Sequence, residues 1–339
     1  MTQIVLAPTP EDAGLEKSQR RPLDWTWHQI KNNPGAATGG IVFLGILLLS
    51  LPARLVAPYD PRASFATHYV APSPSHWLGL DDGGHDMVSL LIYGTRTSLY
   101  VGFAASFIAI IIGVGLGLLA GYYGRGPDAT ISSVTDFFLV IPEVPLMMVL
   151  SATLPGGQSL NKMILIIGGL LWTWTVRVIR SQVMSVKERV YVRRAKALGA
   201  TDWRIVTRHV LPQVAPLIIV NFVLTVAVAV FDESALSFLG LGDPLAISLG
   251  RILDNANQGS AATLGAWWAL VPAGAVIAIL ILSLTLMGQA VEDALNPRLK
   301  VSHLSRKHFL LLPNRSTDSG RPDPTPRASS RDDSLGNVA

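Results

Sequence analysis

Residues Leu99–Tyr122 form the feature that most limits what this chain can fold into. These 24 residues contain no Asp, Glu, Lys, Arg or His. As an α-helix with a rise of about 1.5 Å per residue they would reach about 36 Å, which exceeds the roughly 30 Å hydrocarbon core of a bilayer. A buried helix of a soluble domain would be shorter and would carry a polar stripe. The segment therefore predicts a transmembrane helix.

Five further segments are long and apolar enough to be spans, although several contain Pro or Gly. They are residues 39–56, 134–154, 163–179, 214–239 and 267–286. Membrane helices tolerate both residues because neighbouring helices satisfy the freed backbone groups. Charged residues make up only 15% of the chain, against about 25% in soluble domains. We therefore expect an all-α integral membrane protein with six transmembrane helices.

The first 35 residues are polar and contain Pro, with no short apolar core after a basic start. This pattern does not fit a cleavable signal peptide. We expect the first span to be an uncleaved anchor.

Lys and Arg are distributed unevenly between the loops. The arm before the first span and the loop between the fourth and fifth spans are rich in them, whereas residues 57–98 carry only Arg62 and Arg96. The loop before the sixth span carries Arg251 alone, and the C-terminal side begins with Arg298. Cytoplasmic loops hold the excess of Lys and Arg in membrane proteins. The alternation predicts a multi-pass plasma (inner) membrane protein with both termini in the cytoplasm.

The spans divide the chain into four parts. They are a cytoplasmic N-terminal arm (1–36), the first transmembrane helix with an external loop (37–95), a core membrane domain (96–295) and a cytoplasmic tail (296–339). The core domain includes a long cytoplasmic loop, residues 181–212. From about residue 313 the tail consists of Pro, Ser, Arg and Asp with hardly an apolar residue. Such a segment cannot bury enough surface to offset its ordering entropy, so we expect it to be disordered.

The cytoplasmic loop 181–212 is strongly basic and patterned. Its run VYVRRAKAL has apolar residues near helical spacing, and Gly199 then offers a stop. The run ATDWRIVTRHVL starts a second helix with Thr201 or Asp202 as N-cap, and Pro212 is expected to end it. One face of this second helix is expected to hold Trp203, Val206 and Val210. The pattern predicts two short helices joined at a glycine.

Three interpretations fit a basic loop of this kind. Positive charge alone would fix the topology and meet anionic lipid. A DNA-reading helix-turn-helix needs a second helix that is free to enter a groove. Both ends of this loop are tethered to spans within a few residues, so we do not expect a nucleic-acid partner. The third interpretation is a docking element for a cytoplasmic protein, in which small residues let two backbones approach closely.

The stretch YVRRAKALGATDWRIVTRHVLPQVAP, residues 191–216, resembles the cytoplasmic loop signature of binding-protein-dependent ABC transporter permeases. It is most similar to the dipeptide/oligopeptide/nickel permease family, in its second-subunit type. Other motifs extend the resemblance, in the family's order, over roughly residues 25–300. They are NNPGAATGG, LVAPYDP, PSPSHWLGLDDGGHD, IYGTRTSLYVG, GLLAGYYG, ESALSFLGLG, WW and DALNPR.

The resemblance implies a type I ABC importer permease fold and a subunit that translocates di- or oligopeptides. It also implies a second homologous permease subunit, two cytoplasmic ABC ATPase subunits and an external solute-binding protein, with membrane lipid around the spans. The ATPase subunits would hydrolyse ATP, so this chain itself is not expected to be an enzyme or to hold a cofactor. Nickel or another small solute is the alternative substrate within the family. An ATPase-independent secondary transporter or channel is the alternative from another class.

The residues implied in coupling to the ATPases lie within the cytoplasmic loop. They are Arg193, Arg194, Ala195, Leu198, Gly199, Ala200, Arg204, His209 and Pro212. The family usually has Glu-Ala-Ala where this chain has Arg193, Arg194 and Ala195, so the charge of this part of the surface is inverted. Either the partner ATPase offers acidic groups there, or the two guanidinium groups meet lipid phosphates.

Three carboxylates lie inside expected spans, where ionisable residues are costly and usually face a bundle interior or a water-filled path. Glu143 lies between Pro142 and Pro145, which are expected to interrupt the backbone ladder of the third span. It is a candidate for the translocation path, with a hydrogen bond to a neighbouring helix as the alternative. Asp232 and Glu233, near the external end of the fifth span, are candidates for the same path, with hydration at the membrane interface as the alternative.

Three other features have simpler explanations. LPGGQSL, residues 154–160, looks like the signature loop of an ABC ATPase, but the chain has no Gly-rich phosphate loop ending in Gly-Lys-Ser/Thr. We expect it to be a turn between two spans. The seven histidines lack metal-ligand spacing and the chain has no cysteine, so no metal site is expected. Asp136 is expected to pair with a basic group near the cytoplasmic end of its span.

Overall fold

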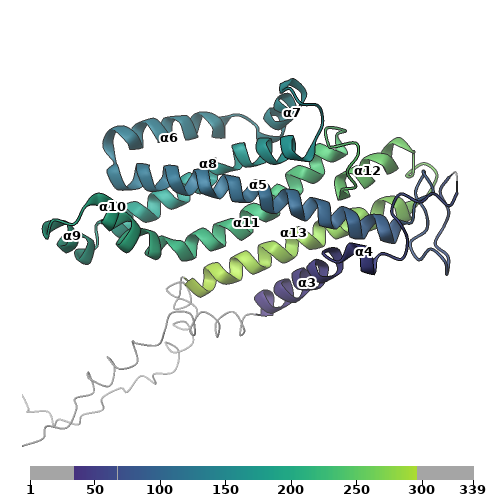
Figure 1. The fold of residues 1–339 in the computed structure, drawn as a ribbon, viewed down its shortest axis with the longest axis horizontal. Coiled ribbons are helices and arrows are strands. Elements are labelled where there is room, and N and C mark those ends of the chain that lie inside the picture. Colours follow the sequence, from purple (N-terminus) through teal and green to yellow (C-terminus); the bar gives the residue numbers. More distant parts are fainter. Residues whose placement is uncertain (1–33, 67, 296–339) are drawn as a thin grey trace, which may run out of the picture. The chain divides into compact units, whose positions relative to one another are not determined.

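The computed structural model describes residues 34–66 and 68–295, and this part of the chain is helical (Figure 1). The elements are α3 (Pro34–Ser50), α4 (Ala53–Val56), α5 (Met87–Tyr123), α6 (Arg125–Val140), α7 (Glu143–Thr153), α8 (Leu160–Lys187), α9 (Val190–Ala197), α10 (Asp202–Ile205), the π-helical turn η2 (Val206–Val210), α11 (Leu211–Phe238), α12 (Leu249–Gln258) and α13 (Trp267–Leu295). The expected all-α class is confirmed for these residues. Most of the N-terminal arm, up to residue 33, and the tail from residue 296 lie outside them.

Four described helices are long and apolar enough to cross a membrane. They are Met87–Tyr123, Leu160–Lys187, Asp202–Phe238 and Trp267–Asp293. The pair α6 and α7 passes the same criteria jointly, which gives up to five spans. The helix expected as the first span is apolar but shorter, at Ala37–Ser50. Six spans, and the cytoplasmic side of both termini, stay predictions.

The expected third span, residues 134–154, is not one continuous helix. Helices α6 and α7 meet at an angle of 90°. Pro142 has no N–H and disfavours helical geometry in the residue before it, and Ile141 is accordingly extended, with φ −79° and ψ 128°. Pro145 lies in the first turn of α7, where a missing N–H leaves no helical bond unmade. The break is therefore due to Pro142 alone, and the expectation that both prolines interrupt the ladder is wrong.

Helix α5 is the longest uninterrupted element and lies against α8 at close range. One of its edges carries Gly113, Gly117 and Gly121, spaced four residues apart so that they share a face. A Cβ added at Gly117 would lie 2.8 Å from the Cβ of Ile179, and one at Gly121 would lie 2.7 Å from the Cβ of Val183. Small residues at this spacing let membrane helices pack backbone to backbone. The α5–α8 pair is the rigid centre of the described fold.

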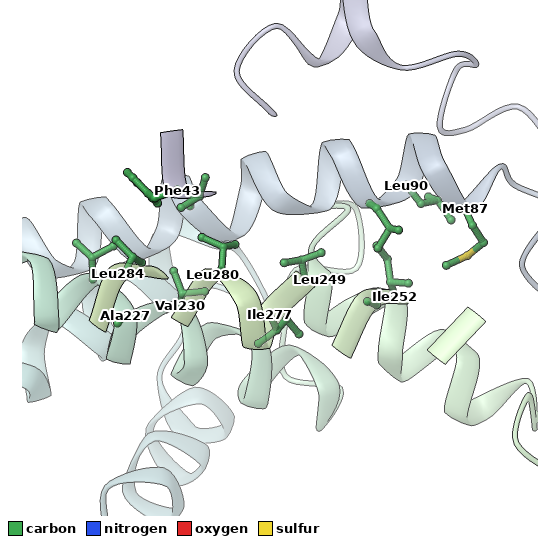
Figure 2. Close-up of a cluster of buried hydrophobic side chains, with 14 residues drawn as sticks. Phe43, Met87, Leu90, Ala227, Val230, Leu249, Ile252, Ile277, Leu280 and Leu284 are labelled. Carbon is green, nitrogen blue, oxygen red and sulfur yellow. The ribbon is translucent and has the colours of Figure 1, made fainter. Parts of the chain in front are cut away.

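The main apolar core joins helices that are far apart in sequence (Figure 2). Phe43 of α3, Leu90 of α5, Val230 of α11, Leu249 of α12 and Leu280 of α13 all contribute buried side chains. Five helices thus share one cluster, which holds the short helix α12 between α5, α11 and α13.

Candidate functional site

The basic loop between α8 and α11 folds as two short helices joined at a glycine, as the sequence predicts. Helix α9 ends at Ala197, and Gly199 has a φ of +84°, a conformation that L-residues rarely adopt. Thr201 is the N-cap of α10 because its hydroxyl accepts a hydrogen bond from the Arg204 N–H at 3.4 Å. The two helices and their glycine joint are called the coupling loop below (residues 188–205).

The coupling loop is attached to the spans by a hydrophobic cluster. Val192 of α9, Ile205 of α10 and Val210 of η2 are buried and pack with Ile179 and Val183 of α8. Ile205 holds the core position, whereas Trp203 is 77% exposed. Of the three residues predicted to share one face, Trp203, Val206 and Val210, only Val210 is buried, and the π-helical turn that follows α10 changes the helical periodicity between them.

The second helix of the loop does not end at Pro212. The chain continues as a helix from Asp202 to Phe238, through η2 and into α11. Pro212 lies in the first turn of α11, directly after η2. The expectation that Pro212 ends the helix is wrong. The π-helical turn η2 precedes it, in which the Leu211 N–H bonds the Val206 carbonyl oxygen five residues back, and the helix continues past the proline. The loop therefore leads without interruption into the apolar helix α11.

Two polar contacts hold the end of α5, one from the coupling loop and one from α8. The Tyr122 hydroxyl donates a hydrogen bond to the Asp202 carboxylate at 2.6 Å. The ammonium group of Lys187, in the last turn of α8, donates to the carbonyl oxygens of Gly121 at 2.7 Å and Tyr122 at 3.4 Å. Cations stabilise the carbonyl end of a helix. Helix α5, helix α8 and the loop therefore meet at one point.

The other side of the loop is open and basic. Arg193, Arg194, Leu198 and Arg204 are exposed, and Leu198 is 88% exposed. The Arg193 Nε donates to the Glu188 carbonyl oxygen at 3.0 Å, whereas the guanidinium of Arg194 has no bonded partner among the described residues. Of the remaining residues implied in coupling, Gly199 and Pro212 are exposed. The other three, Ala195, Ala200 and His209, are half-buried.

Glu233 is buried completely, so hydration at a membrane interface does not describe it. Its carboxylate accepts hydrogen bonds from the Ser98 hydroxyl at 2.6 Å and the Ser237 hydroxyl at 2.8 Å. The Ser98 oxygen in turn accepts from the Leu249 N–H at 3.2 Å, in the first turn of α12. This network joins α5, α11 and α12.

Asp232 is 3% exposed, and its Oδ2 has no hydrogen-bond partner among the described residues. Asp232 is therefore buried within the described fold, as Glu233 is. Glu143 opens α7 and lines a cavity of about 200 Å³ at the break between α6 and α7, together with Trp174 of α8. Helix α7 packs on α11, the helix that carries Asp232.

Ion pairs fasten α6 to α8. The expected partner of Asp136 is Arg177, with a distance of 2.6 Å between Arg177 Nη2 and Asp136 Oδ1. A second pair, Asp128 with Arg180, is bidentate through Nε and Nη2 and is less exposed. Sequence reasoning missed this second pair and the bond between Tyr122 and Asp202. The only signal in the sequence was an aspartate near the start of α6 and a tyrosine at the end of an apolar run.

The loop before α5 contains two histidine–aspartate pairs. His76 Nδ1 lies 3.0 Å from Asp86 Oδ1, and Asp86 Oδ2 caps α5 by accepting from the Ser89 N–H. His85 Nδ1 lies 3.0 Å from Asp81 Oδ1. Within residues 34–66 and 68–295 no group of three or more His, Cys, Asp or Glu side chains is placed to hold a metal ion.

Tyr69 of this loop donates its hydroxyl to the Ala256 carbonyl oxygen at 3.4 Å. Burial raises the pKa of the Tyr69 hydroxyl, and the carboxylates of Asp82 and Asp81 add to the effect. The hydroxyl therefore keeps its proton at neutral pH and stays a donor to the last turns of α12.

The sequence pattern of the family described as "Binding-protein-dependent transport system inner membrane component" matches residues 113–301, which is more than half of the chain. The chain belongs to this family. A second pattern, "N-terminal TM domain of oligopeptide transport permease C", matches residues 22–72. The match to the inner membrane component covers α8, the coupling loop, α11 and α12.

Curated relatives of this inner membrane component match it over nearly their whole length. The dipeptide transport system permease protein DppC of Alkalihalophilus pseudofirmus is 33% identical, over 88% of this chain and 97% of the relative. DppC of Haemophilus influenzae is 34% identical, over 85% of this chain and 99% of the relative. The oligopeptide transport system permease protein OppC of Mycobacterium bovis is 31% identical, over 77% and 89%.

A solved structure shares the fold of this inner membrane component. A chain of the MetNI methionine ABC transporter, in inward-facing conformations, matches with a TM-score of 0.50 at 20% identity. The match covers 61% of this chain and 97% of the MetNI chain. The helical core is therefore that of an ABC importer permease, in a multi-pass inner membrane protein.

Proposed function

We propose that this permease imports di- or oligopeptides that an external solute-binding protein delivers. The observation that carries the proposal is the similarity to proteins named as dipeptide and oligopeptide permeases, which extends over 88% and 77% of the chain in two of the relatives. The similarity extends over the spans and the coupling loop together and is not limited to a single motif.

The proposed arrangement has six spans with both termini in the cytoplasm, α6 and α7 together forming the third. Residues 1–36 and 296–339 are then cytoplasmic, and the loop before α5 is external. A second homologous permease subunit packs beside this one. Exposed apolar side chains on the spans support contact with that subunit and with lipid, among them Phe107 and Ile111 of α5 and Leu282 of α13.

The coupling loop is the proposed contact with two cytoplasmic ABC ATPases, which hydrolyse the ATP. Its attachment supports this role, because buried contacts to α8 and a continuous helix into α11 make it a rigid lever. ATPase closure would then rock the spans between outward-open and inward-open states. The exposed guanidinium of Arg194 supports an acidic partner surface in place of the family's usual arrangement.

The proposed path runs past Glu143 and Asp232. A cavity at Glu143 and an unpaired, buried Asp232 oxygen support this assignment, since charged groups within spans usually face a bundle interior or a watery path. The serine bonds of Glu233 support a structural role for that residue instead.

Reconstitution tests the proposal. The permease is purified with its sister permease, both ATPases and the binding protein, and uptake of labelled tripeptide and of nickel is measured in proteoliposomes with and without ATP. ATP-dependent peptide uptake is expected. Uptake by the permease alone, without ATPases, would indicate a secondary transporter or channel, and ATP-dependent uptake of nickel but not peptide would overturn the peptide assignment.

A further inference from the structure

A polar cavity of about 950 Å³ lies between the segment before α5, the first part of α5 and the loop before α12. Its walls include Arg54 and Arg62 from the first side, Tyr93 from α5, and Asp243 from the loop. Ligand pockets in proteins commonly measure about 300–1,000 Å³. The cavity is thus large enough for a short peptide.

The cavity lies at the opposite end of α5 from the coupling loop. Tyr93 is in the second turn of this helix, whereas Tyr122, which bonds Asp202, is in its last turn. Twenty-nine residues separate the two tyrosines, which corresponds to about 43 Å along a helix. In the proposed topology the cavity is therefore on the external side, where a solute-binding protein would release its peptide.

The two arginines of the cavity have no carboxylate partner among the described residues. The side chain of Arg54 makes no hydrogen bond or ion pair there, and that of Arg62 makes one long hydrogen bond, 3.4 Å from Nη2 to the neutral Leu245 carbonyl oxygen. Both guanidinium groups are exposed. The cavity therefore has two permanent cations with free N–H donors.

The carboxylates of the same cavity are already engaged with backbone donors. Asp243 Oδ1 accepts from the Leu245 N–H at 2.9 Å and its Oδ2 from the Leu160 N–H at 3.3 Å. Asp60 Oδ1 accepts from the Arg62 N–H at 2.9 Å. These bonds hold both carboxylates against backbone N–H groups of the loops, whereas the two guanidinium groups keep unused N–H donors for a ligand.

We propose that this cavity binds the terminal carboxylate of the incoming peptide through Arg54 and Arg62. The planar guanidinium fork matches a carboxylate and forms parallel, charge-assisted hydrogen bonds with it. The rings of Tyr59 and Tyr93 line the same space and offer contact area to peptide side chains. This inference rests on the proposed function, because it concerns the recognition of the transported peptide.

The test uses the complete importer in proteoliposomes with saturating, peptide-loaded binding protein. Uptake rates of trialanine and trialanine amide are measured for wild type, Arg54→Gln, Arg62→Gln and Arg96→Gln. Arg96 is the matched control, since it is an exposed arginine of α5 that does not line the cavity. Each variant is reported as its acid-to-amide rate ratio divided by the wild-type ratio, so that the unchanged binding protein's preference cancels.

Arg54→Gln and Arg62→Gln should each lower this ratio about tenfold, as expected for one charge-assisted hydrogen bond, and Arg96→Gln should leave it unchanged. Equal losses for acid and amide peptides, as a lipid-phosphate site would give, would overturn the inference. So would an equal effect of Arg96→Gln. If the wild-type importer takes up neither peptide in an ATP-dependent way, the proposed function itself fails.

Discussion

The Tyr122 hydroxyl donates a 2.6 Å hydrogen bond to the Asp202 carboxylate, although the two residues are 80 positions apart in the sequence. Tyr122 lies in the last turn of α5, and Asp202 is the first residue of α10. The bond therefore connects a membrane helix to the coupling loop at a point where α9 and α10 meet. A contact in this place can set how firmly the loop follows the spans.

Removal of this hydroxyl should loosen the coupling loop. We expect Tyr122→Phe to lower the local stability of the loop by about 1 kcal/mol, a typical contribution of one hydrogen bond. Tryptic cleavage at the arginines of α9 should then be faster in the purified complex, and ATP-driven uptake slower. Tyr123→Phe is the control, since Tyr123 is exposed and its hydroxyl has no partner among the described residues. Equal cleavage rates in the two variants would contradict this role.

A side chain added at Gly199, the joint between α9 and α10, should impair transport. A Cβ at Gly199 meets no atom within 4 Å, but its φ of +84° is strained for an L-residue, which costs about 1–3 kcal/mol. Gly199→Leu should abolish uptake while membrane insertion persists. Gly265→Leu is the matched control, with a φ of +68° and equally open space outside the loop. Normal transport by Gly199→Leu would rule out the docking role.

Replacement of Glu233 should mainly lower the thermal stability of the complex, whereas replacement of Glu143 should mainly lower uptake. Glu233→Ala leaves the buried hydroxyls of Ser98 and Ser237 without their acceptor, which should cost about 1–3 kcal/mol and lower the thermal midpoint of the complex. Glu143→Gln, at a half-buried site beside a cavity, should lower uptake with little change in that midpoint. Thermal unfolding in detergent and uptake in proteoliposomes measure the two effects. The opposite pattern would reverse the two assignments.

The two ion pairs of α6 should contribute unequally. In the pair of Arg180 with Asp128 the side chains are 32% and 18% exposed, whereas in that of Arg177 with Asp136 they are 51% and 62% exposed. Exposed pairs contribute about 0–1 kcal/mol. Asp128→Asn should therefore destabilise the complex more than Asp136→Asn in thermal unfolding. Equal shifts of the unfolding midpoint in the two variants would show that the bidentate geometry of the Asp128 pair contributes no extra stability.

The absence of cysteine makes the topology directly measurable. Trp77, in the loop before α5, is 76% exposed and Trp203, in the coupling loop, is 77% exposed. In intact cells a membrane-impermeant maleimide should label Trp77→Cys and not Trp203→Cys, with the order reversed in inside-out vesicles. Labelling of both from the same side would refute the proposed orientation.

Local patterns predicted several features because local physics decides them. Gly199 stops α9, and Thr201 caps α10, since both effects depend on residues within one turn of the helix. The apolar run at Leu99–Tyr122 lies within α5 for the same reason. The start of α5 was not predicted, because Asp86 caps it through a loop whose fold depends on His76.

Features that depend on distant partners were predicted incorrectly or not at all. Trp203 and Ile205 are both apolar, and only the packing of α8 under the loop decided that Ile205 is buried. Asp232 and Glu233 are adjacent in sequence, yet only Glu233 meets hydroxyls brought by α5.

The sequence alone determined that the chain is helical and membrane-spanning and where its basic loop lies. It also determined where the first helix of that loop ends and the second begins, because hydropathy and capping act over a few residues. The tertiary structure decided which charges are paired, which carboxylate is bonded to serine hydroxyls, and that Arg54 and Arg62 share one cavity. These relationships join residues from separate helices and loops. Their energies depend on distance and burial in space, which the order of residues along the chain does not specify.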